Sequence, residues 1–185
     1  MLKSVYKDII VYILSFLSDH EKLKFTSVNK SMNSYKFIVK YDEIHDYEKI
    51  KSLSFYKNFN KVKYIACDNK IPPYVTHLIF GEKFNQNIKN CIPSSVTHLT
   101  FGHCFNQDIK NCIPFGVTHL SFGSWFCKEI KDCIPSSVTH LTFGFCFNQN
   151  IKDCIPVSVT HLTLRKSYNK SKLDGIDPRI RITFK

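Results

Sequence analysis

The sequence has almost no alanine and no long hydrophobic run. The nine-residue apolar stretch Ile9 to Leu17 is followed by SDHEKLKF, which lacks small residues at the spacing of a signal-peptide cleavage site, and Ala66 is the only alanine. Nine residues are also too few to cross a bilayer, which takes about 20. We therefore expect no secretory signal and no membrane contact, and a soluble, intracellular, most simply cytoplasmic protein with reduced cysteines.

Arginine is scarce although the chain is basic. Lysine and arginine together number 26 against 15 acidic residues, for a formal net charge of +11, yet only Arg165, Arg179 and Arg181 could supply the planar fork that reads guanine or clamps phosphate. The charge makes nucleic acid, anionic surfaces and acidic proteins conceivable partners. The lack of arginine argues against sequence-specific DNA reading.

What the sequence does contain is a repeat. The tripeptide Thr-His-Leu recurs in register with the Ile-Pro pairs, and one unit reads I-P-x-x-V-T-H-L-x-F-G-x-x-F-N-x-x-I-K-[N/D]-C. Units of this kind cannot bury their apolar face alone and must stack. The Ile-Pro pairs are 21 residues apart and start at residues 71, 92, 113, 134 and 155.

Each unit predicts one short strand. The segment Val96 to Phe101 is β-branched and aromatic, follows a proline and ends at Gly102. Its apolar spacing matches the leucine-rich-repeat pattern, so one strand per coil implies a parallel sheet in a solenoid. Phe105 and Ile109 are then expected to point inward from the other side of the coil.

The ends of the array are less regular. The last unit loses its consensus residues, as a capping coil does, and Arg179 to Phe184 alternates in a way that predicts a final edge strand. Upstream, Leu53 to Phe55 resembles the strand core and is interpreted as a degenerate first coil. The expected organisation is a helical segment at 1–45, a degenerate coil or linker at 46–70, repeats at 71–164 and a cap at 165–185.

The N-terminal segment predicts helices. Apolar residues at helical spacing indicate an amphipathic helix from Asp8 to Leu17, and Asp19 is expected to cap a second helix that carries Leu23 and Val28. So short a helical segment buries too little surface to be stable alone. The fold class is therefore α+β, with short helices followed by a leucine-rich-repeat-like parallel β-solenoid.

The repeats resemble the FNIP repeat, whose Phe-Asn and Ile-Pro elements stand here as Phe84-Asn85, Phe105-Asn106 and Phe147-Asn148 together with the Ile-Pro pairs. Phe126-Cys127 departs from the pattern by losing the asparagine. FNIP proteins are similar to leucine-rich repeats and are typical of amoebae and of the giant viruses that infect them.

The stretch Ile13-Leu14-Ser15-Phe16-Leu17 is followed by a polar break and then by Leu23, Val28 and Lys30. This pattern resembles an F-box, although the usual opening Leu-Pro and the proline of the break are absent. The resemblance implies docking on a Skp-type adaptor of a cullin ubiquitin ligase, with the repeats holding a protein substrate and no enzymatic chemistry in the chain itself. The residues implied in adaptor binding are Ile13, Leu14, Leu17, Leu23 and Val28.

Two further sets of residues repeat with the coils, and neither predicts a catalytic or metal site. Each His and Cys occurs in every coil, whereas an active site is a single constellation. A line of identical side chains also diverges instead of converging on a metal ion. We expect a solvent-facing histidine ladder, small apolar cysteine fillers and no cofactor. The residues concerned are His77, His98, His119, His140 and His161, and Cys91, Cys112, Cys133 and Cys154.

Two surfaces remain as binding candidates. Lys89, Lys110, Lys131 and Lys152 form a basic stripe that could bind an acidic partner or, less plausibly, nucleic acid, if it is more than a solvated face. A specific partner is more readily bound by positions that vary between otherwise identical coils, unless their variation is neutral drift. These positions are Glu82, His103, Phe115, Ser124, Trp125 and Phe145.

Overall fold

The computed structural model describes the backbone of residues 2–185 and the side chains of residues 6–185. It contains two compact units, residues up to Lys63 and residues Tyr64–Lys185. Each unit is described by itself.

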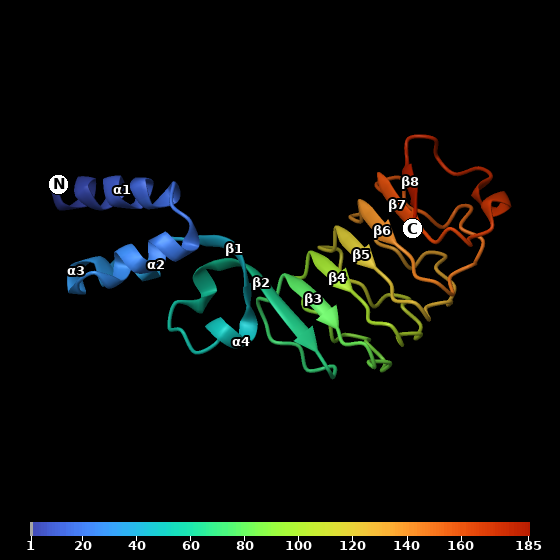
Figure 1. The fold of residues 1–185 in the computed structure, drawn as a ribbon, viewed down its shortest axis with the longest axis horizontal. Helices are drawn as coiled ribbons and strands as arrows, with labels where there is room; N and C mark the ends of the chain where they lie inside the picture. Colours follow the sequence, from blue (N-terminus) through green and yellow to red (C-terminus); the bar gives the residue numbers. More distant parts are fainter. Residues whose placement is uncertain (1) are drawn as a thin grey trace. The chain divides into compact units, whose positions relative to one another are not determined.

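The first unit is mostly helical (Figure 1). Helix α1 begins at Leu2, six residues before the predicted start, because no glycine or proline interrupts the segment ahead of Asp8. The other elements are the short helices and strand that follow it and strand β2, which runs parallel to β1. In order they are α1 Leu2–Ser15, α2 Asp19–Ser27, α3 Lys30–Asn33, a 3₁₀ helix Ser34–Phe37, β1 Tyr41–Asp46, α4 Tyr47–Ile50, a 3₁₀ helix Tyr56–Asn58 and β2 Phe59–Ala66.

The cap of α2 differs from the prediction. Ser18, not Asp19, is the N-cap: its hydroxyl accepts from the backbone N–H of Glu21, and the Glu21 carboxylate accepts from the backbone N–H of Ser18. This is a capping box, which satisfies two backbone donors at once. Because Ser18 fills that role, the carboxylate of Asp19 is free to bind elsewhere.

The helical unit has a small core of its own, in which Leu14 packs with residues of β1 and β2. Leu53 to Phe55, whose spacing resembles the strand core, does not form a strand. Phe55 lies in a turn and packs in this core, with its ring 6.0 Å from that of Phe59. The strand begins at Phe59 instead. The buried members of the core are Leu14, Val39, Tyr41, Ile50, Phe59 and Val62.

The second unit is the predicted parallel solenoid, with one strand per coil (Figure 1). Successive strands pair 21 residues apart, so that His98 lies beside His119 and Leu99 beside Leu120. The last pair, β7 with β8, is offset by 20 residues, and β8 confirms the predicted edge strand. The strands are β3 His77–Phe80, β4 His98–Thr100, β5 His119–Ser121, β6 His140–Thr142, β7 His161–Leu164 and β8 Arg181–Phe184, with a 3₁₀ helix Lys170–Leu173 between the last two.

Stacked phenylalanines form the core of the solenoid. Phe101 and Phe122 of successive coils stack with ring centroids 5.3 Å apart, and on the opposite wall Phe105 stacks on Phe126 at 6.2 Å. Phe105 and Ile109 are fully buried, which confirms their predicted inward direction. The core is therefore a continuous apolar column shared by neighbouring coils.

Candidate interaction surfaces

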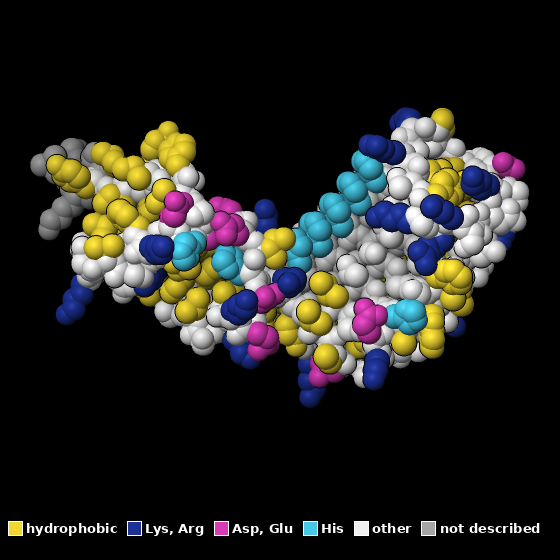
Figure 2. Space-filling model, in the orientation of Figure 1, with side chains coloured by type: hydrophobic (Ala, Val, Ile, Leu, Met, Phe, Trp, Pro, Cys, Tyr) yellow, Lys and Arg dark blue, Asp and Glu magenta, His cyan; other side chains and the backbone are white. Residues whose placement is uncertain are grey.

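The outer face of the sheet carries a ladder of histidine rings. Within each strand the residues alternate between buried and half-exposed positions, so His and the residue two places later face outward. The five rings from His77 to His161 stack with centroids 4.1 to 4.4 Å apart and nearly parallel planes. Figure 2 shows them as one row along the solenoid. The predicted ladder is therefore present.

Two more features complete this face. Arg181 takes the register position of the next histidine, beside His161. The second outward position carries a hydroxyl in every strand from β4 on, which we call the hydroxyl ladder. Its members are Thr100, Ser121, Thr142, Thr163 and Thr183. Sequence analysis missed the hydroxyl ladder, although its signal, Ser or Thr two residues after each histidine, is plain in the repeat.

A threonine fixes the orientation of each ring. Thr118 Oγ1 lies 3.0 Å from Nδ1 of His119 and 3.2 Å from the carbonyl oxygen of Thr97. That carbonyl already accepts the backbone N–H groups of Thr118 and His119, at 2.8 and 3.1 Å. Since a carbonyl oxygen has two lone pairs, we assign the hydroxyl proton to Nδ1. The neutral ring then carries its own proton on Nε2.

The ladder is not arranged as a metal site. The imidazole planes of His119 and His140 are within 10° of parallel, so their nitrogen lone pairs do not converge on one point. The pKa of His119 is lowered, first by burial and then by the neighbouring histidines His98, His140 and His161. The ring is therefore biased towards its neutral form.

The described residues contain one group of three potential metal ligands, Asp19, Glu43 and His45 in the helical unit. Asp19 is almost fully buried and already accepts from Lys22 Nζ at 3.0 Å and from His45 Nε2 at 2.9 Å. Its carboxylate also accepts the backbone N–H groups of Asp42 and Glu43, at 3.1 and 2.8 Å.

These bonds decide the role of Asp19. Burial acts to raise the pKa of Asp19, but the hydrogen bonds from His45, Glu43, Lys22 and Asp42 outweigh it and hold the pKa below its usual range. A cation at this point would meet the ammonium group of Lys22. The cluster therefore joins α2 to β1 and is a structural hub, which sequence analysis missed by assigning Asp19 to the helix cap.

The varying positions gather on the turns that follow the strands, with one exception. The turns stack through backbone bonds such as Trp125 N–H to the carbonyl of His103, 3.0 Å. The His103 and Trp125 rings lie 5.4 Å apart, and the guanidinium of Arg165 lies 5.3 Å from the centre of the Phe145 ring. Glu82 and Ser124 belong to the same stacked turns. We call this surface the aromatic turn patch.

The exception is Phe115, which is 72 % exposed but lies in the turn before β5. Trp125, which is 54 % exposed, lies in the turn after β5, so the strand stands between it and Phe115. Phe145, which is 58 % exposed, lies in the turn after β6, at the same end of the strands as Trp125. The structure therefore brings together five of the six predicted partner-binding residues, and Phe115 stands on another edge.

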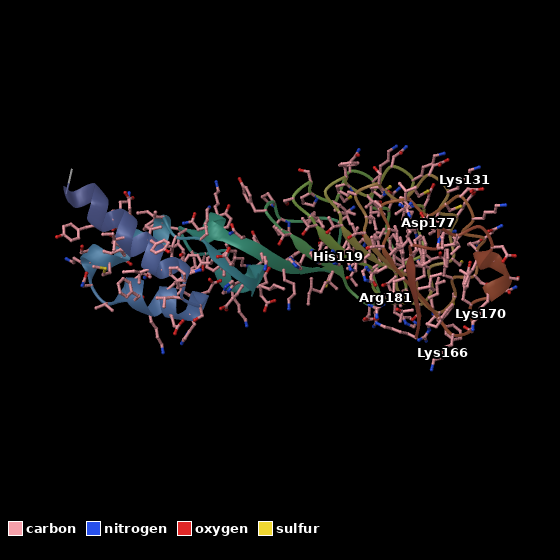
Figure 3. The ribbon with its side chains drawn as sticks, turned by 90° about the horizontal axis from the view of Figure 1, so that it is seen from above. His119, Lys131, Lys166, Lys170, Asp177 and Arg181 are labelled. Carbon is pink, nitrogen blue, oxygen red and sulfur yellow. The ribbon has the colours of Figure 1, made fainter. Side chains whose placement is uncertain are left out.

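The lysine stripe is exposed but locally mixed in charge. Lys110 and Lys131 line the same hollow as Asp108, Glu129 and Asp132. Figure 3 places Lys131 well apart from His119 and Arg181. The stripe is therefore a separate surface from the ladder face, and its positive charge is partly balanced by neighbouring carboxylates.

The cysteines of the repeat are buried or half-buried. Cys133 is buried and its Sγ–H donates to the carbonyl of Lys131 at 3.2 Å, while Cys112 and Cys154 are half-buried. Burial is the first cause that raises the pKa of all three thiols. Such thiols stay protonated and behave as small fillers, and a nucleophile would need the reverse.

The predicted adaptor-binding residues divide between core and surface. Leu14 is fully buried in the core of the helical unit, so it cannot contact a partner without unfolding. Leu17 and Leu23 are partly buried against that core, whereas Ile13 and Val28 are exposed. Sequence spacing alone could not separate the two faces of α1, because both are apolar.

The outer face of α1 is a continuous apolar surface, which we call the α1 face. Its side chains recur every three or four residues and are between 49 and 71 % exposed. The rings of Tyr12 and Phe16 meet edge to face, 5.0 Å apart. Its members are Tyr6, Ile9, Tyr12, Ile13 and Phe16.

These features define the class of protein. One parallel strand per coil, a shared apolar core and exposed surfaces that repeat or vary along the stack are those of a leucine-rich-repeat-like β-solenoid, a class that serves as a binding scaffold. Among the described residues, no helix is both long and apolar enough to span a membrane.

The chain belongs to the FNIP repeat family. The model described as FNIP Repeat matches residues 68–104, 105–146 and 147–175, more than half of the chain. No curated protein matches. A solved structure described as "The crystal structure of CroV588 a novel circular LRR protein structure" is 38 % identical over 67 % of this chain, with a TM-score of 0.59. The match covers 20 % of that protein, so this chain corresponds to a fraction of its length.

Proposed function

We propose that this protein is an interaction scaffold that acts as a substrate receptor of a cullin-type ubiquitin ligase. The helical unit docks on a Skp-type adaptor, and the solenoid holds a protein target. The chain supplies positioning and no catalysis. The hydroxyl–imidazole pairs of the ladder recur from coil to coil, whereas an active site is a single constellation.

One observation carries the adaptor half of the proposal: the α1 face is apolar, aromatic and exposed. Contiguous apolar surface of this kind is typical of a protein interaction site. Exposed Val28, together with His20, Leu23 and Lys24, lines a shallow hollow on α2. An amphipathic helix laid into a partner's groove would use the α1 face as its anchors.

The target half rests on the aromatic turn patch. Aromatic residues and arginine are the side chains most often found at energetic centres of interfaces. Trp125, Phe145 and Arg165 lie together on adjoining coils of a rigid stack. We expect this patch to contact the target.

The first experiment is a pull-down of the full chain with a purified Skp-type adaptor. The double variant Ile13→Asp, Phe16→Asp changes only exposed residues, so it keeps the fold and is expected to lose the adaptor. Trp125→Ala, Phe145→Ala is the matched control in the other unit and is expected to retain the adaptor. If the wild type does not bind, or if both variants bind equally, the adaptor role is refuted.

The lysine stripe leaves a weaker alternative, binding of an acidic partner or nucleic acid. Its lysines are exposed, but Asp108, Glu129 and Asp132 line the same hollow. Binding through this stripe would fall steeply with added salt. A Lys110→Gln, Lys131→Gln variant tests that alternative without touching the α1 face.

A further inference from the structure

The ladder face between β5 and β8 is a row of hydrogen-bond donors. In the assigned tautomer, Nδ1 accepts from threonine, so each neutral imidazole carries a proton on Nε2. A protonated imidazole carries one there as well. His119, His140 and His161, followed by Arg181, therefore present N–H groups to the outside in either charge state. We call these four residues the imidazole strip.

The threonine beside each ring allows the ring to take a second proton without losing a bond. When Nδ1 becomes protonated it donates to Thr118 Oγ1, 3.0 Å away, and the hydroxyl proton turns away from the ring. The same contact recurs at His140 and at His161. The scaffold thus holds each ring in one place in both charge states.

The face carries no negative charge of its own. The strands β3 to β8 contain no aspartate or glutamate. The charges that act on His119 are those of His98, His140 and His161. Two acidic residues lie close to these strands in the sequence. Glu82 is on the turn after β3, and Asp177, which precedes β8, is paired with Arg179. Protonated rings stacked about 4 Å apart repel one another, and a bound anion would offset this repulsion.

We propose that the imidazole strip and the adjoining hydroxyl ladder bind an acidic polypeptide segment of the target, and that the binding strengthens as the histidines are protonated. This inference rests on the proposed role of the solenoid in holding a target. Carboxylates accept hydrogen bonds from Nε2–H, from the Arg181 guanidinium and from the hydroxyl ladder. A carboxylate beside a ring also favours the charged form of the imidazole, so binding such a segment takes up protons.

Nucleic acid fits this face less well. Single-stranded nucleic acids bind through aromatic faces on which bases stack. Here the faces of His119 and His140 are covered by one another, with centroids 4.2 Å apart, and only ring edges are available. One arginine also gives little capacity for bidentate phosphate contacts.

The test uses the full chain and a fluorescently labelled octamer of glutamate, with fluorescence anisotropy measured at pH 5.5 and pH 7.5. The strip variant is His119→Asn, His140→Asn, because the asparagine oxygen can still accept from the threonine hydroxyl. His103→Asn, an exposed histidine on the aromatic turn patch, is the matched control. Urea denaturation confirms that each variant is folded.

We expect the wild type and His103→Asn to bind about tenfold more tightly at pH 5.5 than at pH 7.5, as two new charge contacts at the surface would give. The strip variant should lose this gain, and Arg181→Gln should weaken binding at both pH values. An equal affinity at the two pH values would overturn the proposal. The proposal would also be overturned if only the Lys110→Gln, Lys131→Gln variant lost binding of the octamer. A further contradicting result would be displacement of the octamer by an oligothymidine of equal charge at a lower concentration than unlabelled octamer requires. Since no adaptor is present, failure here leaves the α1 docking test unaffected.

Discussion

Glycine at positions 102, 123 and 144 marks the closest approach of neighbouring coils. A Cβ atom added at Gly123 would lie 2.0 Å from the carbonyl oxygen of Gly102, whereas at Gly81 the nearest atom is 3.5 Å away. The first is a clash with backbone, which cannot move aside without shifting a coil, and the second is ordinary contact.

Gly123→Ala should therefore lower the free energy of unfolding by about 2 to 3 kcal/mol, as overpacking in a tight core does. Gly81→Ala should stay within about 0.5 kcal/mol of the wild type. Urea denaturation of the two variants gives the comparison directly. Equal effects would mean that the coils are not packed as closely as described.

The asparagine of the Phe-Asn element builds a ladder across the coils. The side-chain oxygen of Asn85 accepts from the backbone N–H of Asn106 at 2.9 Å, and Asn106 does the same for Cys127 at 3.1 Å. A thiol at position 127 cannot offer the amide oxygen that the next coil would use. Cys127 is thus a gap in this ladder.

Cys127→Asn should restore the ladder and raise the free energy of unfolding by about 1 kcal/mol, the typical contribution of one hydrogen bond. Cys146→Asn, on an exposed cysteine outside the ladder, should change stability little. Thermal and urea unfolding of the two variants would show the difference. Destabilisation by Cys127→Asn would show that the coil has adapted to cysteine.

Stability should also depend on the protonation of His119. The pKa of His119 is lowered from 6.5 in the folded chain, first by burial and then by its neighbours. Below pH 6.5 the unfolded chain therefore binds more protons than the folded one, and stability falls as the pH drops. The pKa values of Asp19 and Asp177 are also lowered, but these carboxyl groups change the stability only at a pH near or below their ordinary pKa of 3.8.

We expect a lower free energy of unfolding at pH 5.5 than at pH 7.5, and a smaller difference in His119→Asn. Urea denaturation at the two pH values measures both quantities. If the variant kept the whole pH dependence of the wild type, His119 would not be its source.

At the scale of elements, α1 combines a core face and an outer face. Leu14 is fully buried and Ile13 is half-exposed, although they are adjacent and both aliphatic. Leu14→Ala should lower the free energy of unfolding by about 2 to 5 kcal/mol and loosen the core of the helical unit, while Ile13→Ala should change it little. Amide hydrogen exchange in α1, α2 and β1 reports this loss locally. Equal protection in the two variants would contradict the orientation of α1.

The sequence predicted the repeated strands in their correct register, whereas elements that occur once were placed less accurately. Phe105 and Ile109 could be assigned to the core because the same spacing recurs in every coil and leaves one consistent inward face. Leu53 to Phe55 copied the strand spacing in a segment without repeats, where no second copy could correct the register. The true strand, β2, is defined by its pairing with β1 and β3, and its residues Phe59 and Val62 share a core with Leu14.

The candidate surfaces were predicted in part for the same reason. The histidine ladder follows from periodicity, and the aromatic turn patch from variation within it. Asp19 could not be identified as a hub, because its partners Asp42, Glu43 and His45 are distant in sequence and come together only through the fold. The separation of Phe115 from Trp125 likewise depends on where the strand lies between them.

At the scale of the whole chain, the last coil protects the end of the solenoid. Leu173, Ile176 and Ile182 pack against the core, and β8 pairs with the free edge of β7. Without this coil the apolar side chains of the coil before it would be exposed, and an exposed apolar patch favours association with another chain. Deleting residues 165–185 should therefore lower stability and cause self-association, which sedimentation velocity would detect. A monomeric deletion variant with unchanged unfolding would show that the coil is dispensable.

The proposed scaffold role separates the surface for the adaptor from the surfaces for the target. The measurement that tests this most directly is hydrogen–deuterium exchange of the full chain with and without a purified Skp-type adaptor. The account predicts that protection appears in α1 and α2 and leaves β3 to β8 unchanged. Protection confined to the solenoid strands, or no protection at saturating adaptor, would contradict it.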